Sequence, residues 1–251
     1  MSARRAAKEQ DLNRRLARMP LNDDGNAQRL MERYGDVLLY ADGYRWVWFN
    51  GKVWDLRTGL YHASQLAKRT AQAIHAEAET LRDQDQLPET CQYLVDIGVA
   101  SDKEVAEQKI NERREKIHGH AVKSGNTRAV SDMLTSARDH CVVAPDIFDQ
   151  CVDRFACENG TVALFPVDKQ GEKHAPEYKR SWRADDLMSA LIPCAYDPDA
   201  TCPEFQRFLA RAQPDGEMRA FLQRLAGYIL TGRASEQVVI LMYGAAAAGK
   251  G

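Results

Sequence analysis

Apolar residues recur at intervals of three or four in several stretches of the chain, a spacing that predicts helices with one buried face. Residues 127–140 show the pattern most clearly, because four apolar side chains fall on a single stripe: Val130, Met133, Leu134 and Ala137. The same spacing predicts helices over Asn26–Tyr34, Ala63–Gln86, a segment opened by Pro203, and Glu217–Leu230. Another is predicted from Ser101 to Ile117, because Ser101-Asp102-Lys103-Glu104 has the spacing of a capping box. We expect Pro88 to end the helix over Ala63–Gln86 and Gly232 to end the helix over Glu217–Leu230. The helix opened by Pro203 and the helix over Glu217–Leu230 should pack together.

Two Asn-Gly pairs interrupt this helical pattern, each flanked by aromatic or β-branched residues. Because both residues of a tight hairpin turn adopt positive φ, such pairs are strong hairpin signals. We predict one hairpin over Arg45–Trp54, around Asn50-Gly51, and a second around Asn159-Gly160. The tryptophans of the first hairpin could stack on unpaired bases, but we favour core packing, because aromatic residues dominate protein cores. Residues 168–180 are polar and predict an exposed loop.

The last residues of the sequence are an unbroken apolar run followed by small residues. Val238–Tyr243 shows no polar alternation, as expected for a strand covered on both faces in a parallel sheet. The next residues fit the first seven places of the phosphate-binding loop G-x-x-x-x-G-K-[ST]: Gly244, Ala245, Ala246, Ala247, Ala248, Gly249 and Lys250. Small residues let backbone N–H groups surround a phosphate, and Lys250 can reach the β- and γ-phosphates. We therefore predict nucleotide binding here, although Gly251 stands where Ser or Thr would contact Mg²⁺.

Composition excludes some classes of protein. Lys and Arg total 34 against 36 for Asp and Glu, so any contact with a polyanion must be local. Residues 2–18 hold six basic and two acidic side chains; they either touch DNA or, as we favour, form a solvated and frayed terminus. No C-x-x-C pair, signal peptide or long apolar span occurs, which predicts a reduced, cytoplasmic protein without membrane contact. His118 and His120 have no neighbouring cluster of metal ligands, so we assign them no chemistry.

Several short sequences resemble the poxvirus-like primase-helicases of phages and plasmids, whose motor belongs to helicase superfamily 3. They follow the family's order from Gly25-Asn26-Ala27 and Tyr34-Gly35-Asp36, through Gly51–Trp54, Glu158-Asn159-Gly160-Thr161-Val162, Tyr196–Ala200 and Cys202–Phe205, to Leu225–Gly232 and the terminal loop. The resemblance spans about Asn22 to Gly251. It implies a ring-forming ATPase, usually a hexamer, that uses ATP and Mg²⁺ and acts on single-stranded DNA or a replication fork. Such proteins are encoded by phages or prophages and act in the cytoplasm of a bacterial host.

The resemblance also assigns roles by position. Gly244, Gly249 and Lys250 would match the family's phosphate loop, whereas Ala248 stands where the family commonly has Asn. The acidic Mg²⁺ motif, the sensor residue and the arginine finger lie beyond Gly251 in such proteins, so we expect this chain to hydrolyse nothing and assign it no catalytic residue. No acidic cluster precedes the resemblance, which predicts a helicase-side module without a primase.

The predicted fold is therefore α+β, with a mainly helical N-terminal region and two β-hairpins that lead into the first strand and phosphate loop of an α/β, AAA+-like ATPase domain. We divide it into a basic arm (1–21), a hairpin region (22–62), a helical helicase-associated domain (63–200, with a hairpin near 155–165) and the start of the ATPase domain (201–251). Two alternatives remain open. The chain could be a non-catalytic oligomerisation or DNA-binding module of a replication initiator, or belong to another phosphate-loop NTPase or kinase, since the loop specifies nucleotide but not substrate.

Overall fold

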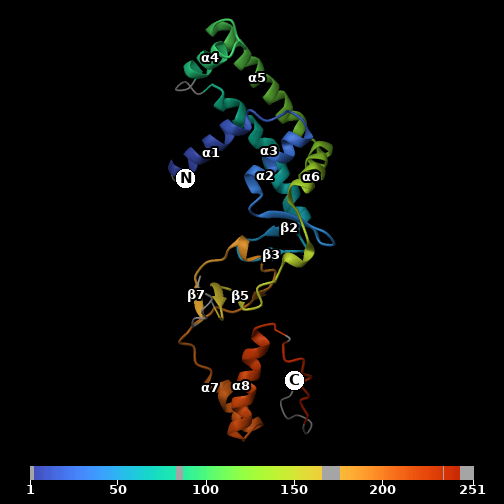
Figure 1. The fold of residues 1–251 in the computed structure, drawn as a ribbon, viewed down its shortest axis with the longest axis vertical. Helices are drawn as coiled ribbons and strands as arrows, with labels where there is room; N and C mark the ends of the chain where they lie inside the picture. The colour runs from blue at the N-terminus through green and yellow to red at the C-terminus, as the bar shows by residue number, and fades with distance from the viewer. Residues whose placement is uncertain (1–2, 83–86, 166–175, 234, 244–251) are drawn as a thin grey trace. The chain divides into compact units, whose positions relative to one another are not determined.

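The computed structural model describes residues 3–82, 87–165, 176–233 and 235–243 (Figure 1). Helices and two small mixed sheets make up this part of the chain, which confirms the predicted α+β class. The chain divides into two compact units. The first comprises Met1–Asn50 and Asp55–Pro145, and the second comprises Gly51–Trp54 and Asp146–Gly251. The domain boundaries drawn from the sequence stay a prediction.

The first unit is mainly helical. Its helices are α1 (Ala3–Leu16), α2 (Asp23–Tyr34), α3 (Gly59–Thr80), α4 (Leu87–Asp96), α5 (Lys103–Ser124) and α6 (Thr127–Cys141). Helices α2, α3 and α6 pack on one another, and α3 lies along α5 (Figure 1). The predicted stripe of α6 is buried in the main core, where Val130, Met133, Leu134 and Ala137 meet Leu30 of α2 and Ala67 of α3. This core packs α3 against α2 and α6.

The ends of two helices differ from the prediction. Helix α3 ends at Thr80 rather than Gln86. Pro88 does not close it but lies in the first turn of α4, where a missing N–H costs nothing because that group has no partner within the helix. The N-cap of α5 is Asp102, whose side chain accepts a hydrogen bond from the Val105 N–H over 2.9 Å.

The described part of this segment, residues 3–18, also differs from the frayed terminus that we favoured. It contributes α1, whose C-terminal end packs into the first unit with Asn13 and Leu16 buried, as is the following Ala17. The apolar side chains of Leu16 and Ala17 explain this burial, because they remove apolar surface from water. The basic residues at the start of α1 remain exposed.

One sheet has the order β3-β2-β1-β4, formed by β1 (Leu38–Ala41), β2 (Arg45–Phe49), β3 (Trp54–Asp55) and β4 (Val142–Val143). Its residues belong to the first unit apart from Trp54. Its main hairpin joins β1 to β2 in antiparallel register, with Leu38 opposite Trp48. The turn of this hairpin contains Asp42-Gly43, with Gly43 at φ +81°. The hairpin predicted around Asn50-Gly51 is also formed, because β2 and β3 are hydrogen-bonded neighbours in the sheet. The strand predicted after Asn50-Gly51 is β3, which has only two residues. Asp-Gly is itself a strong turn pair, although no hairpin was predicted at this position.

The second unit contains the other sheet, in the order β7-β6-β5-β8. Strands β5 (Arg154–Cys157) and β6 (Gly160–Ala163) form the hairpin predicted around Asn159-Gly160. Strand β7 (Glu177–Lys179) pairs with β6, so three residues of the predicted loop are an edge strand instead, while β8 (Leu191–Ile192) runs parallel to β5. Short 3₁₀ helices cover Pro145–Ile147 and Ala184–Asp186. Val53, Ala156 and Met188 form the core beside this sheet.

The predicted tryptophan packing is confirmed for Trp46, which is buried in the core of the first unit, and for Trp54, which is buried in the second. The Trp54 indole N–H donates to the Ala184 carbonyl over 2.8 Å. Trp48 is only half-buried.

Helices α7 (Pro203–Ala212) and α8 (Gly216–Leu230) are present as predicted, and Gly232 follows α8 with φ +62°. No residue of either helix is fully buried, whereas Leu209, Leu222 and Leu225 are half-buried, so the packing of the two helices together stays a prediction. Six large apolar side chains are exposed on them: Phe205, Phe208, Met218, Phe221, Ile229 and Leu230. Across the described ranges, no helix is both long and apolar enough to cross a membrane.

The predicted strand Val238–Tyr243 is not formed. These residues have no strand partner in either sheet, and Val239, Leu241 and Tyr243 are 88%, 82% and 95% exposed. A strand covered on both faces requires neighbouring strands and helices, and the described residues supply none for this segment. The prediction of a buried strand is therefore wrong for this structure.

Candidate functional site

The predicted nucleotide loop, Gly244 to Gly251, lies outside the described residues. The structure therefore places none of its backbone amides and does not position Lys250. The polar and aromatic groupings described next are in the first unit, on α2, α3 and α5 and the residues that pack against them.

The first grouping is a buried arginine on α2. Arg29 is fully buried, and its Nε donates to Oε2 of Glu77 on α3 over 2.8 Å. Its terminal nitrogens donate to the carbonyl oxygens of Leu16, Pro20 and Gly25 at 2.8 to 3.0 Å. The Leu16 carbonyl is at the C-terminal end of α1, where carbonyl groups have no partner within the helix. Arg29 therefore joins α1, α2 and α3 with its hydrogen bonds.

Two more arginines complete this cluster. Arg33 donates from Nη2 to Oε1 of Glu77 over 3.0 Å and to Oδ1 of Asn13 over 2.7 Å. Arg113 on α5 donates to the Met19 carbonyl over 2.6 Å, and burial together with the nearby charge of Arg29 lowers its pKa. These groups are enclosed and their contacts are with the protein itself, which makes the cluster a structural one.

The histidine that was assigned no chemistry at position 120 has a packing role. His120 Nε2 lies 2.8 Å from Oδ1 of Asn26 and 3.2 Å from Oγ of Ser124. Asn26 in turn donates from Nδ2 to the same Ser124 hydroxyl over 3.0 Å. Burial, followed by the charge of Arg29, lowers the pKa of His120. This small network links α2 to α5.

His118 belongs to a separate cluster on the surface. Its Nδ1 lies 3.1 Å from Nδ1 of His75 on α3, and its Nε2 lies 2.9 Å from Oε1 of Glu79. Arg114 donates to both Glu79 oxygens, at 2.9 and 3.2 Å. Although partial burial acts to raise it, these hydrogen bonds and charges hold the pKa of the Glu79 carboxyl below its ordinary value. No local sequence pattern indicates this cluster, because His75 and His118 are 43 positions apart.

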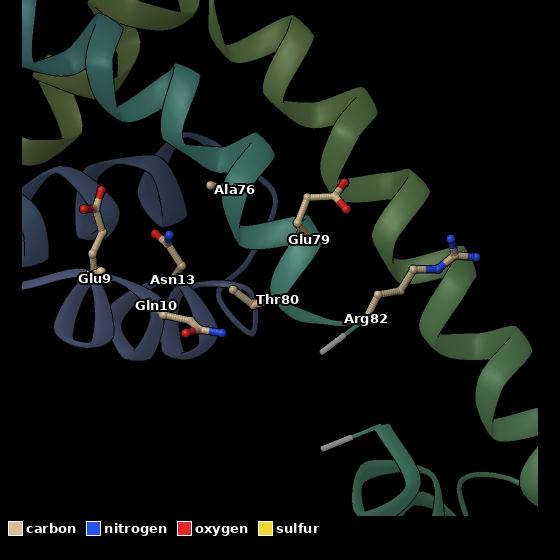
Figure 2. Close-up of a pocket in the computed structure, with 8 residues that line it drawn as sticks. Glu9, Gln10, Asn13, Ala76, Glu79, Thr80 and Arg82 are labelled. Carbon is tan, nitrogen blue, oxygen red and sulfur yellow. The ribbon is translucent and has the colours of Figure 1, made fainter. Parts of the chain in front are cut away.

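A hollow of about 440 Å³ lies between α1 and the C-terminal end of α3 (Figure 2). Its polar lining comprises Glu9, Gln10 and Asn13 of α1 with Glu79, Thr80 and Arg82. Figure 2 shows the Glu79 carboxylate pointing toward α5, and Arg82 donates to Asn111 of α5 over 3.2 Å. The hollow is lined by two carboxylates, Glu9 and Glu79, and its one guanidinium, Arg82, is hydrogen-bonded to Asn111. It is therefore poorly suited to a phosphate or another anion.

An aromatic row lies at the N-terminal end of α3. The Trp48 and His62 rings meet edge to face with centroids 3.9 Å apart, and the Tyr61 and His62 rings do the same at 5.2 Å. Tyr61 is 64% exposed. Asp55 fixes the start of the helix by accepting hydrogen bonds from the backbone N–H groups of Arg57 and Thr58. An exposed, well-anchored ring of this kind can stack on a nucleic-acid base.

The charge around this row is basic along α3. Lys68 and Arg69 are exposed, and Lys68 follows Tyr61 by seven residues, which places both on one side of the helix. A face of α5, in contrast, is lined by carboxylates: Glu104, Glu107, Glu112 and Glu115. A polyanion would be attracted to the α3 surface and repelled from that face of α5.

The comparison with protein families adds the decisive observation. The family described as D5 N terminal like matches residues 27–214, from α2 to just beyond α7. The chain belongs to the D5 N terminal like family. Members of this family are found in phage and plasmid primase-helicases, as the short sequences around Gly25, Asn159 and Pro203 suggested. No curated protein and no solved structure matches the chain.

The D5 N terminal like match includes the groupings described above apart from α1 and the residues up to Asn26. It ends before the predicted loop at Gly244, so it supports the replication context of the chain and not an ATPase motif. Sequence reasoning found the family but missed the Arg29 cluster, the aromatic row and the His75–His118 pair.

Proposed function

We propose that this chain is the N-terminal part of a phage- or plasmid-type replicative DNA helicase that couples ATP hydrolysis to DNA unwinding. One observation carries the proposal: a D5 N terminal like domain over 27–214 is followed in the same chain by a sequence that fits a phosphate-binding loop, Gly244 to Lys250. Either feature alone would be ambiguous. Together, and in this order, they favour a replication motor.

In the proposed motor, Gly244 to Gly251 bind the phosphates of ATP. Backbone N–H groups of the small residues surround the phosphate oxygens, and the Lys250 ammonium neutralises charge that develops on the β- and γ-phosphates. Mg²⁺, if bound with ATP, would neutralise phosphate charge. Gly251 has no hydroxyl that could contact the ion, so another residue would have to supply that ligand.

For the DNA partner, the aromatic row of Trp48, His62 and Tyr61 is the best candidate contact among the described residues. Base stacking on Tyr61 would be insensitive to sequence, as a translocating helicase requires. Lys68 and Arg69 further along α3 would contact phosphates. The expected ligand is single-stranded DNA, because the bases of a duplex are stacked on one another and cannot stack on a tyrosine ring.

A second candidate function is a non-catalytic oligomerisation or DNA-binding module. The exposed apolar side chains of α7 and α8 favour it, because large exposed apolar surfaces mark interaction sites. The same surfaces would also serve the homo-oligomer, expected to be a hexamer, that the helicase proposal requires. Another phosphate-loop NTPase or kinase is disfavoured by the D5 N terminal like match.

The test of the helicase proposal compares the full-length protein with its Lys250→Ala variant. We expect the variant to lose both ATP hydrolysis and the unwinding of forked DNA, whereas Lys116→Ala, a change of an exposed lysine on α5, should retain both. Retained ATPase activity in Lys250→Ala would refute the role of this lysine. If the full-length wild type neither binds nor hydrolyses ATP, yet assembles and binds single-stranded DNA, the module is the correct function.

A further inference from the structure

His75 and His118 face each other across two helices that pack along their length. The two Nδ1 atoms are 3.1 Å apart, and the ring planes are tilted by 30°. His75 lies on the exposed side of α3, and the side chain of His118 on α5 is 31% exposed. The pair is thus reachable from solvent but is held in place by the α3–α5 contact.

Glu79 decides which nitrogen of His118 is available. An ionised carboxylate can only accept a hydrogen bond, so the His118 Nε2 atom, 2.9 Å from Glu79 Oε1, must be the donor. In the neutral ring this leaves Nδ1 with a free electron pair, directed at His75. Arg114 holds Glu79 through both carboxylate oxygens. A carboxylate that accepts from the outer nitrogen of a histidine is the arrangement found behind metal-bound histidines.

We propose that His75 and His118 form a two-histidine site for a divalent transition-metal ion of the zinc class, bridging α3 and α5. Two imidazole nitrogens bound to Zn²⁺ with tetrahedral geometry are about 3.3 Å apart, close to the 3.1 Å observed here. The ion takes the place of the proton that the two Nδ1 atoms share. His75 changes from the Nδ1–H to the Nε2–H form, so no proton is lost overall.

The chemistry of the donors sets the selectivity of this site. Imidazole nitrogen suits Zn²⁺, Ni²⁺ and Cu²⁺, whereas Mg²⁺ and Ca²⁺ require oxygen ligands. The described residues contain no group of three or more His, Cys, Asp or Glu that could hold a metal ion. Water or an outside ligand therefore completes the coordination, and the ion is exchangeable rather than permanently enclosed.

The experiment uses the untagged 251-residue chain with its exposed thiols removed (Cys151→Ser, Cys194→Ser and Cys202→Ser), because cysteines also bind zinc. Calorimetric titration with ZnCl₂ should show about one ion per chain, and Zn²⁺ should raise the Tm whereas MgCl₂ at the same concentration should not. His75→Ala and His118→Ala should each abolish this binding. Glu79→Gln, which removes the charge behind His118, should weaken it about 10- to 100-fold.

The matched control is His140→Ala, which removes another exposed histidine, located on α6 beside Asp24, and should leave zinc binding unchanged. Circular dichroism of each variant without metal establishes that it folds, and His75→Gln replaces His75→Ala if the smaller residue disturbs the helix. Zinc binding that persists in the folded His75 and His118 variants would overturn the proposal. The proposal would also fail if the chain that lacks the three exposed thiols, with both histidines intact, binds no zinc. Neither result depends on ATP or DNA, so the helicase proposal stands or falls separately.

Discussion

Arg29 and Glu77 form an ion pair of 2.8 Å in which neither side chain is exposed to solvent. Glu77 also forms an ion pair with Arg33, so two guanidinium groups of α2 share one buried carboxylate. A buried pair need not add net stability over apolar residues of the same size, but removing one partner leaves an uncompensated charge in the interior. The packing of α2 against α3 therefore depends on the Glu77 side chain.

Replacing Glu77 should reveal this dependence. Glu77→Gln keeps the shape of the side chain but removes its charge, and we expect a loss of about 3–5 kcal/mol in the free energy of unfolding, measured by denaturant titration. Asp132→Asn is the control, since its partner Arg128 is 95% exposed and the pair should contribute only about 0.3–0.5 kcal/mol. Similar losses in the two variants would contradict the interpretation of the cluster.

Two glycine substitutions should act with opposite sign. A Cβ atom at Gly59 would lie 2.0 Å from the Trp46 carbonyl oxygen and 2.6 Å from the Val47 Cα, so Gly59→Ala must push α3 away from β2. We expect a destabilisation of about 1–3 kcal/mol or more. Gly119→Ala, within α5, meets no atom within 4 Å and should stabilise the protein by about 0.4–1 kcal/mol, because alanine is the better helix former. Thermal unfolding of both variants tests the pair, and an equal effect of the two would show that the α3–β2 contact is looser than described.

The stability of the fold should depend on the protonation of His120. Because burial and Arg29 lower its pKa from the ordinary value of 6.5, the folded protein keeps this ring neutral at a pH where the unfolded chain already protonates it. The corresponding stability is complete above that ordinary value and is lost as the pH falls through the lower pKa of the folded state. His120→Gln should therefore lose less stability than the wild type between about pH 8 and pH 5 in denaturant titrations. Parallel losses in the two proteins would show that other groups control the acid sensitivity.

Single-stranded DNA binding should depend on Tyr61. Tyr61→Ala should weaken binding of a fluorescent oligonucleotide by about 1–3 kcal/mol, the contribution of one stacked base. Tyr93→Ala is the matched control, because Tyr93 is 60% exposed on α4, away from the aromatic row. Binding by the wild type should also weaken steeply as salt rises. Equal binding by both variants would remove the aromatic row from the proposed DNA contact.

The six cysteines should separate into two reactivity classes. Cys91, Cys141 and Cys157 are buried, and burial raises the pKa of each thiol, to about 11 for Cys141. Cys151, Cys194 and Cys202 are exposed. A thiol reagent should therefore modify three groups quickly in the native protein and the other three only after denaturation. Rapid modification of all six would show that the cores of the two units open readily.

Local sequence patterns sufficed where the deciding interactions are close in the chain. The apolar stripe of α6 and the Asn159-Gly160 hairpin were predicted correctly, because helix periodicity and turn geometry act over a few residues. The family, too, was found from short sequences around turns and helix ends. Boundaries were less reliable: α5 is capped by Asp102 and not Ser101, since either side chain can accept the same kind of hydrogen bond.

Taken by itself, the sequence determined the α+β class, the positions of most helices, the family and the candidate loop at Gly244 to Lys250. Only the tertiary structure decided that Arg29 would share Glu77 with Arg33, that His118 would face His75 and not act with His120, and that the apolar run at Val238–Tyr243 would stay unpaired. The reason is that charge pairing, imidazole contacts and strand pairing join residues distant in the chain. Their distances are set by how helices and sheets pack, which no short stretch of sequence specifies.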